Sequence, residues 1–361
     1  MTNIVITGGA GFIGKRLALS LCAVGHSVTV FDSLQLQVHP DPDKTVTELE
    51  QAGVTFTLGD VRDSKALTDA LVTAETDIVV HLAAETGTGQ SYDMPAHYCD
   101  VNVTGTAHLI EALRSAQTKG IKVRQVVLAG SRAVYGEGAC LDGEGRMTTA
   151  VPRLSTDLAV GDFTPKDAAG RHLEPIASCA TTTVPAPASI YASTKLMQEY
   201  LLRQGLEQSG VEVAVLRLQN VYGAGQSLHN PYTGVLSIFV QQLLDGKTLD
   251  IYEDGKIVRD FVYVSDVVAA FHLLCEMEQG PTETVDIGSG KGASILEVAL
   301  TMIDALGIDG PCVNISGRFR PGDVRFAVAD ISAAERVLAW TPQVSLSDGI
   351  RDLVDWARKT A

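Results

Sequence analysis

Long apolar runs, a basic leader segment and an excess of positive charge are all missing from this chain. Its 361 residues contain no uninterrupted apolar stretch near the 18 or so residues that a membrane span requires, so no membrane partner is expected. The first residues carry no basic charge and lead into an apolar segment, so we expect no signal peptide and a cytoplasmic location. The net charge of −15 argues against a nucleic-acid partner, because phosphate backbones are bound by basic surfaces.

Cysteine is also scarce, and no two cysteines have the Cys-x-x-Cys spacing of a metal or redox motif. We therefore expect reduced, partly buried thiols at Cys22, Cys99, Cys140, Cys179, Cys275 and Cys312. Internal repeats are absent as well. With 45% hydrophobic residues and a mean hydropathy of +0.14, the chain suits a compact protein with a full core and two lobes.

The first half alternates short apolar runs with helical patterns, which predicts an α/β fold with a parallel sheet covered on both faces. We expect strands at 4–7, 27–31, 54–58, 78–82, 126–129 and 211–218, and helices at 12–24, 64–73, 96–117 and 190–208. Later segments predict strands at 249–252, 258–263 and 284–287, and helices at 235–244, 265–277 and 295–306.

These patterns predict a doubly wound Rossmann-type domain at 1–218 and a smaller C-terminal α/β lobe at 219–361, some of whose segments return to the first domain. Residues 137–188 interrupt the alternation. They are rich in glycine, proline, threonine and charge and show little periodicity. We expect them to be an insertion over the substrate cleft.

A glycine-rich turn, Gly8-Gly9-Ala10-Gly11-Phe12-Ile13-Gly14, joins the first predicted strand to the first predicted helix. Small residues there let the backbone approach a pyrophosphate at the positive end of a helix. Asp32 closes the second strand, where a carboxylate can bind the adenosine ribose and would repel a 2′-phosphate, so NAD is favoured over NADP. Asp60 follows the third strand and could contact the adenine, although a turn signal is an equal alternative.

Tyr191 and Lys195 lie four residues apart in a predicted helix and so share one face. A free tyrosine, with a pKa of about 10, is a poor base at neutral pH. A lysine charge roughly 4 Å away favours the phenolate by up to roughly 4 kcal/mol, which makes the tyrosine a usable base. The pair alone would more often be a solvated helix face, so its meaning depends on the other motifs.

With these motifs in place, the chain resembles the extended short-chain dehydrogenase/reductase family, and within it the NAD-dependent nucleotide-sugar epimerases and dehydratases. The resemblance covers nearly the whole chain in order. It runs through Gly8, Gly11 and Gly14, His81-Leu82-Ala83-Ala84, Asn102-Val103-Thr104-Gly105-Thr106, Ser131-Arg132-Ala133-Val134-Tyr135-Gly136, Tyr191 with Lys195, Arg217-Leu218-Gln219-Asn220-Val221-Tyr222-Gly223, Arg259-Asp260-Phe261-Val262 and Arg320-Pro321-Gly322-Asp323.

The resemblance implies a nucleotide-sugar 4-epimerase in which Ser131, Tyr191 and Lys195 are the catalytic residues. Tyr191 would take the proton of the 4-hydroxyl, Ser131 would bond the same oxygen, and a transient 4-keto sugar would turn over in the pocket. NAD would be bound by Gly8, Gly11, Phe12, Ile13, Gly14, Asp32, Asp60, Val61, Leu82, Ala83, Ala84, Asn102, Tyr191 and Lys195. Substrate contacts are implied for Thr86, Ser131, Arg132, Asn220, Arg259, Arg320 and Ala327, with the diphosphate held by Asn220, Arg259 and Arg320.

Departures from the family pattern bear on the reaction. Family 4,6-dehydratases carry an Asp-Glu pair after the catalytic hydroxyl, where this chain has Arg132 and Ala133, which cannot serve as that acid-base pair. Dehydration is therefore disfavoured. A 4,6-dehydratase nevertheless stays an open alternative on this scaffold, together with a decarboxylase, a 2-epimerase and a non-catalytic NAD-binding sensor.

Within the epimerases, Glu85–Ser91, Asn230-Pro231-Tyr232-Thr233-Gly234 and the insertion look most like the dTDP-L-rhamnose 4-epimerase group, which favours a dTDP-6-deoxyhexose substrate and a role in polysaccharide biosynthesis. Relatives there often carry cysteine pairs in the insertion, whereas this chain keeps only Cys140 and Cys179, so no metal is expected. The small Ala327 is expected to leave room beside the sugar. A homodimer is expected through the helices at 96–117 and 190–208, with Leu109, Ile110, Leu113, Leu196, Met197 and Leu201 available.

Overall fold

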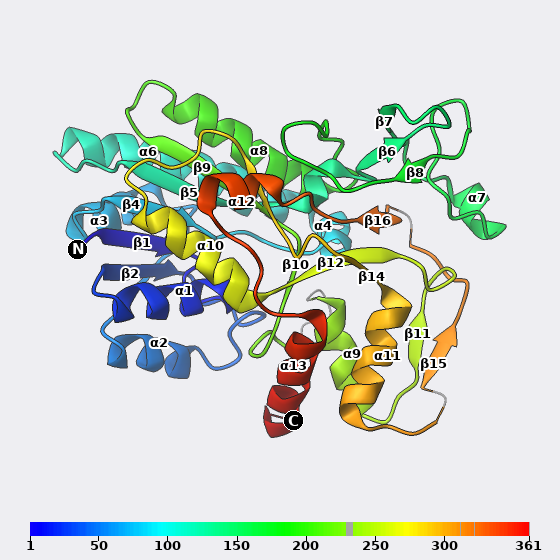
Figure 1. Cartoon of the computed structure of the whole chain (residues 1–361). Helices are drawn as coiled ribbons and strands as arrows, with labels where there is room; N and C mark the ends of the chain where they lie inside the picture. Colours follow the sequence, from blue (N-terminus) through cyan, green and yellow to red (C-terminus); the bar gives the residue numbers. More distant parts are fainter. Residues whose placement is uncertain (229–233, 311, 321, 361) are drawn as a thin grey trace. The chain divides into compact units, whose positions relative to one another are not determined.

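The computed structural model describes residues 1–228, 234–310, 312–320 and 322–360 (Figure 1). The chain forms two compact units. The first comprises Met1–Ser131, Ser193–Arg217 and Val268–Thr284, and the second comprises Arg132–Ala192, Leu218–Val267 and Val285–Ala361. These units are groupings of backbone contacts, and the boundaries of the NAD-binding domain and the substrate lobe stay a prediction.

A seven-stranded sheet forms the centre of the α/β fold, with the strand order β13-β9-β5-β4-β1-β2-β3. The strands β1 to β5 pair in parallel, and β1 is fully apolar in the centre, where Ile4, Val5 and Ile6 are buried. Burial on both faces explains the apolar runs of the central strands β1 and β4. Their bounds are β1 Asn3–Thr7, β2 Ser27–Asp32, β3 Thr55–Leu58, β4 Ile78–His81, β5 Gln125–Ser131, β9 Glu212–Leu218 and β13 Val285–Ile287.

Helices cover the strands of the first unit on both sides, with α1 and α2 on one side and α3 and α6 on the other (Figure 1). The bounds are α1 Phe12–Ala23, α2 Pro42–Gln51, α3 Ser64–Thr73, α4 Thr88–Asp93, α5 Pro95–Tyr98, α6 Gly105–Thr118, α8 Ile190–Leu206 and α10 Val264–Glu276. The prediction for α3 is confirmed, whereas α2 and α4 were not predicted. Asp41 caps α2 by accepting a hydrogen bond from the Lys44 N–H, and Pro42 occupies its first turn.

The single helix predicted at 96–117 is wrong in its first half. The structure has α5, then a π-helix at Cys99–Thr104, and only then α6. Asn102 lies in the π-helix, and its side chain accepts a hydrogen bond from the Glu85 N–H at 2.7 Å. A wider helical turn is a frequent feature of functional positions, and here it carries a residue that the sequence had marked as functional.

The second unit contains three smaller sheets. In one, β10 (Asn220–Tyr222) pairs with β12 (Val258–Tyr263), which also pairs with β14 (Gly292–Ser294) and β16 (Phe326–Ala327). Another joins β11 (Leu249–Ile251) to β15 (Val313–Ile315). The helices of the second unit include α9 Val235–Leu244, α11 Ile295–Leu306, α12 Ser332–Leu338 and α13 Leu346–Thr360. The observed bounds of α9 and α11 confirm the predicted ones.

The insertion at 137–188 has more regular structure than its sequence indicated. Three short strands, β6 (Ala139–Leu141), β7 (Met147–Thr149) and β8 (Glu174–Pro175), form an antiparallel sheet in the order β7-β6-β8, and α7 (Ser155–Ala159) follows β7. Strands of two or three residues show no period in a sequence, which explains why they were not predicted.

Candidate active site

The glycine turn forms a tight backbone cradle at the start of α1. Gly8 has φ +68°, and a Cβ there would lie 2.6 Å from the Ala83 nitrogen. A Cβ at Gly14 would lie 2.6 Å from the Gly8 carbonyl oxygen, so both positions require glycine. The N-cap residue of α1, Gly11, gives no side-chain cap, and the first turn holds no acidic residue. The first N–H groups of the helix are therefore available to an anion. Phe12 and Ile13, in that turn, are half-buried.

Asp32 is buried at the end of β2 and stabilises this cradle. Its Oδ2 accepts a hydrogen bond from the Ala10 N–H at 3.0 Å, and its Oδ1 accepts one from the Leu34 N–H at 2.8 Å. His39 approaches the same carboxylate at 3.6 Å. Because each carboxylate oxygen has two lone pairs, the side chain can still accept a ribose hydroxyl. Besides its expected contact with the adenosine ribose, Asp32 therefore stabilises the glycine turn, which the sequence did not reveal.

Asp60 and Val61 follow β3, and their side chains already have protein partners. Both Asp60 oxygens accept hydrogen bonds from the Arg62 guanidinium, at 2.6 and 3.0 Å, and these bonds lower the pKa of Asp60. Val61 belongs to the hydrophobic core of the first unit. After β4, the half-buried Leu82 and Ala83 donate their N–H groups to the carbonyl and hydroxyl of Thr7, and the half-buried Ala84 follows.

Asn102 binds protein groups with its whole carboxamide. It donates to the Glu85 carbonyl at 3.1 Å and to the Thr194 hydroxyl at 2.9 Å, in addition to accepting the Glu85 N–H. It therefore ties the segment after β4 to α8. Thr86, the next residue along that segment, is exposed, and its carbonyl accepts the Tyr98 hydroxyl at 2.6 Å.

A buried chain of polar groups extends from His81 to Lys195. His81 contacts the hydroxyls of Thr7 at 2.7 Å and Thr106 at 3.1 Å. Gln198 donates to Thr106 at 2.9 Å and accepts a bond from Lys195 Nζ. Burial and the Lys195 charge lower the pKa of His81 to about 3, so its imidazole stays neutral. The family motif marks His81, but Gln198 was missed, although its position three residues after Lys195 in the same helix was a usable signal.

The helix α8 carries Tyr191 in its first turn and Lys195 in its second, on one face as predicted. Lys195 is only 4% exposed, and burial lowers its pKa to about 8. The next residue on that face, Glu199, is held by a bidentate ion pair with Arg217, at 2.7 and 3.0 Å. Glu199 raises the pKa of Lys195, but burial lowers it by more.

Ser131 is buried and is the last residue of β5, and Arg132 begins the short 3₁₀ turn Arg132–Tyr135. Arg132 donates to the Gly136 carbonyl at 3.0 Å, while its Nε is buried and has no hydrogen-bond acceptor among the described residues. Burial and the nearby Arg259 charge lower the pKa of Arg132 to about 10. It therefore still carries its charge at neutral pH.

Three of the expected substrate contacts of the second unit lie on β12 or on a strand paired with it. Asn220 starts β10, half-buried, and pairs with Phe261 of β12. Arg259 donates to the Asp323 carboxylate at 2.5 Å, and in the strand register it lies beside Ala327 of β16, which is only 3% exposed. Arg320 is exposed and packs its guanidinium 4.8 Å from the Tyr252 ring centroid. The residues 230–233 and Pro321 of the two family motifs lie outside the described residues.

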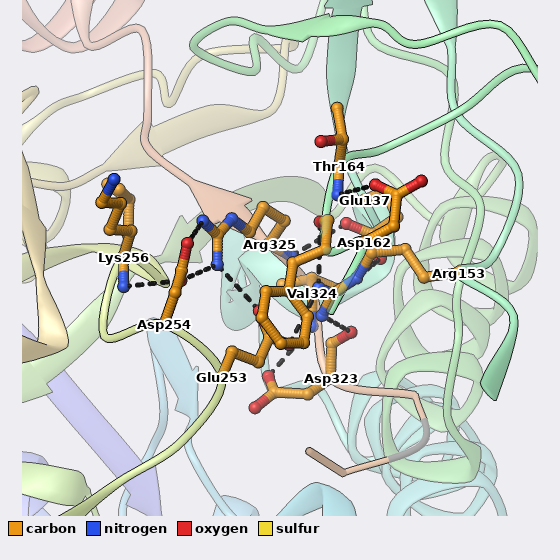
Figure 2. A network of polar contacts seen from close by, with 12 residues as sticks. Glu137, Arg153, Asp162, Thr164, Glu253, Asp254, Lys256, Asp323, Val324 and Arg325 are labelled. Atoms are coloured by element: carbon orange, nitrogen blue, oxygen red, sulfur yellow. Dashed lines mark hydrogen bonds and ion pairs between the residues drawn. The ribbon is translucent and has the colours of Figure 1, made fainter. Parts of the chain in front are cut away.

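Behind Asp323, a buried network of charges fastens the insertion to the rest of the second unit (Figure 2). Arg153, in the insertion, pairs with Glu137 at 3.1 Å and Glu253 at 2.8 Å, and donates to the Asp323 carbonyl at 2.8 Å. The Arg325 guanidinium pairs with Glu253 and Asp254, both within 2.8 Å, and the Arg325 backbone N–H donates a hydrogen bond to Glu137. The sequence did not reveal this network, because its members come from three distant segments.

No three His, Cys, Asp or Glu side chains gather as a metal site within the described part of the chain. Cys140 is buried, which raises the pKa of its thiol to about 11, and Cys179 is half-buried, its thiol 3.1 Å from the Thr181 hydroxyl. Of the helices that the structure describes, none is long and apolar enough to cross a membrane.

Comparison with known proteins places these features in context. The family model described as "NAD dependent epimerase/dehydratase family" matches residues 4–288. The dTDP-L-rhamnose 4-epimerase of Burkholderia thailandensis is 39% identical over 354 residues, which cover 98% of this chain and 94% of that protein.

Two solved structures are similar over essentially the whole chain. The Stenotrophomonas maltophila UDP-glucose 4-epimerase, with bound NAD and formylated UDP-arabinopyranose, has a TM-score of 0.80 at 26% identity and covers 100% of this chain and 99% of its own. The Thermotoga maritima UDP-glucose 4-epimerase with UDP-glucose has a TM-score of 0.78 at 28% identity, covering 99% of each chain.

Proposed function

Because the chain belongs to the NAD dependent epimerase/dehydratase family, we propose that it is an NAD-dependent nucleotide-sugar epimerase that inverts C4 through a transient 4-keto sugar. The observation that carries the proposal is α8, which presents Tyr191 and the buried Lys195 on one face. The 39% identity to a dTDP-L-rhamnose 4-epimerase supports a dTDP-6-deoxyhexose as substrate and a place in polysaccharide biosynthesis.

The residues at the start of the chain fit NAD. The uncapped N-terminus of α1 and the glycine cradle suit a pyrophosphate, and Asp32 can accept an adenosine ribose hydroxyl while repelling a 2′-phosphate. NAD, when bound, supplies the hydride acceptor and donor of the reaction. Gly8, Gly11, Phe12, Ile13, Gly14 and Asp32 would hold it, with Asp60, Val61, Leu82, Ala83, Ala84, Asn102, Tyr191 and Lys195 also in our proposed set.

The protein's own part in the chemistry is proton transfer and orientation. Tyr191 as phenolate takes the proton of the 4-hydroxyl as C4 is oxidised, and returns it to the ketone oxygen as C4 is reduced from the other face. Lys195 supplies the positive charge that favours the phenolate. Ser131 donates a hydrogen bond to the same substrate oxygen.

The substrate's diphosphate and sugar are assigned to the second unit. Asn220, Arg259 and Arg320 are the proposed diphosphate contacts, with Thr86, Arg132 and Ala327 beside the sugar. Arg132 and Ala133 occupy the positions of the acid-base pair in dehydratases, and the charge that Arg132 keeps at neutral pH favours epimerisation over dehydration. No metal takes part in this proposal.

We also propose a cytoplasmic homodimer. The six cysteines are free, as suits a reducing compartment. The core of the first unit includes Leu109, Ile110 and Leu113, and Leu201 packs against it. The sequence suggested that these residues were available to a partner subunit, but their own unit covers them. On α8, Met197 and Tyr200 remain 44% and 47% exposed and are the better candidates for an interface.

The proposed function is tested by incubating the purified protein with a panel of UDP- and dTDP-sugars and resolving products by NMR. Inversion at C4 with no loss of water supports it, and a 4-keto-6-deoxy product would instead indicate a dehydratase. Tyr191→Phe should bind NAD as the wild type does and lose about 10²–10⁴-fold in turnover. Near-normal turnover by this variant would remove Tyr191 from the mechanism.

A further inference from the structure

Gln219 carries a buried carboxamide that the folded protein does not satisfy. The residue is only 5% exposed, and neither its Nε2 nor its Oε1 has a hydrogen-bond partner among the described residues. A carboxamide offers two donors and two acceptor sites. Leaving such a group buried without partners costs roughly 1–3 kcal/mol, so its place in a folded protein calls for a reason.

Within the described part of the chain, the surroundings of the Gln219 side chain offer its amide no hydrogen-bond partner. Its backbone N–H donates to the Ile287 carbonyl at 2.9 Å, and its Cγ lies against Gly288, where a Cβ would come within 2.7 Å of it. The carboxylate of Asp260 lies against the same glycine.

Asp260, however, has no free lone pair. Its Oδ1 accepts from the N–H and hydroxyl of Ser289, and its Oδ2 accepts from the N–H groups of Gly290 and Ala329, with all four distances between 2.6 and 3.2 Å. A carboxylate has about four acceptor sites. Asp260 is thus satisfied by other donors, and among the described residues the Gln219 carboxamide has no partner.

The position of Gln219 in the fold points to a ligand. It directly follows Leu218, the last residue of β9, and precedes Asn220, a proposed substrate contact. In open α/β sheets, ligands bind outside the carboxyl ends of the strands. The neighbouring strand β5 ends at Ser131, the proposed catalytic hydroxyl, and its Gly130 lies against Leu216 and Arg217 of β9.

We propose that Gln219 is a specificity-determining residue whose carboxamide binds hydroxyl groups of the sugar ring. This inference rests on the proposed function. The amide oxygen can accept from one hydroxyl while the amide nitrogen donates to a neighbouring one, so the side chain suits a vicinal pair of neutral hydroxyls. A substrate without one of these hydroxyls leaves the buried amide unpaired, and such sites reject deoxy analogues strongly.

The chain supplies a matched control. Gln125 is also buried, and both of its amide atoms also lack partners among the described residues. It is the first residue of β5, at the amino end of the strand, whereas Ser131 is at the carboxyl end. Removing the amide of Gln125 should therefore leave substrate choice unchanged.

The test compares NAD-loaded wild type, Gln219→Met and Gln125→Met on the nucleotide sugar that the wild type turns over and on its single-deoxy analogues. We expect the wild type to disfavour at least one analogue by about 100-fold in kcat/KM. Gln219→Met should reduce that ratio to within about 10-fold, chiefly by losing activity on the hydroxylated substrate. Gln125→Met should keep the wild-type ratio. If Gln219→Met fails to fold, Gln219→Glu, which keeps the size and the acceptor, replaces it and should lower the same ratio.

An equal loss on every substrate, or an unchanged ratio, would overturn the inference, because a merely structural amide affects all substrates alike. A binding measurement separates recognition from chemistry: the affinity ratio of the same substrates for the Tyr191→Phe protein should fall when Gln219→Met is added. If the wild type turns over no nucleotide sugar at all, the proposed function itself fails, whereas wild-type turnover with an unaltered ratio removes only the role of Gln219.

Discussion

Lys195 shows how burial sets the chemistry of a single residue. Its ammonium lies among Gln198, the neutral His81 and the paired Glu199, and burial lowers its pKa from 10.5 to about 8. The lysine is therefore charged at neutral pH and loses its proton as the pH rises through about 8. The charge that favours the Tyr191 phenolate disappears over the same range.

Turnover should consequently decline above about pH 8. A side chain at position 195 that stays protonated at higher pH should keep the positive charge. We expect Lys195→Arg to lower turnover overall but to move the alkaline limb of the pH profile upward, since arginine keeps its proton. The exposed Lys65 provides the control, because Lys65→Arg should leave the profile as it is. An alkaline limb that stays in place in Lys195→Arg would assign it to another group. The folded state releases this proton before the unfolded chain does, so stability should rise with pH between about 8 and 10.5.

Sequence reasoning could find residues whose role follows from spacing, such as Tyr191 and Lys195, because four positions on a helix fix one face. It could not find Gln219. That residue stands out only because Asp260, its neighbour, is satisfied by Ser289, Gly290 and Ala329. Unmet hydrogen bonds depend on where distant segments fold, and no local pattern encodes them.

At the scale of elements, some helices were predicted to the residue and others were missed. The helices α3, α9 and α11 have the predicted bounds. Those at 42–51 and 346–360 were missed although Asp41 and Pro42 signal the start of the former. The π-helix was not predicted, and the bonds that its Asn102 makes to Glu85 and Thr194 join segments distant in the sequence.

Buried charges connect the insertion to other segments of the second unit. The side chain of Arg153 is 3% exposed and pairs with both Glu137 and Glu253 (Figure 2). Removing one partner of a buried ion pair leaves an uncompensated charge, so Arg153→Met should destabilise the protein by about 3–5 kcal/mol. Urea or thermal unfolding of the variant measures this loss.

Arg146 in the same insertion is the matched control for Arg153. It pairs with Asp142 and Glu144 but is 65% exposed, and exposed pairs are worth about 0–1 kcal/mol. Arg146→Met should therefore unfold nearly as the wild type does. Equal effects of the two substitutions would mean that the network of Figure 2 does not hold the insertion in place.

At the scale of the whole molecule, the central sheet was the part that the sequence predicted best. In β4, the residues Ile78, Val79 and Val80 form a buried apolar run because both faces are covered, and that composition is visible without a structure. The residues of a dimer interface are harder to predict from the sequence than the strands of the sheet. A residue available to a partner must be left uncovered by its own unit, and only the fold separates Met197 from Leu113 in that respect.

The proposed dimer can be tested on this difference. The outward side of α6 is polar, with Glu111 and Arg114 exposed, so the apolar centre of an interface would come from Met197 and Tyr200 of α8. Burying a charge at the centre of such an interface is strongly unfavourable. We expect a dimeric mass for the wild type by light scattering at micromolar concentration and a monomeric mass for Tyr200→Glu.

Tyr92, 81% exposed on α4, controls for the added charge alone, and Tyr92→Glu should remain a dimer. A monomeric wild type would contradict the dimer itself. A dimeric Tyr200→Glu would place the interface on another surface, because a carboxylate cannot be buried there without a partner.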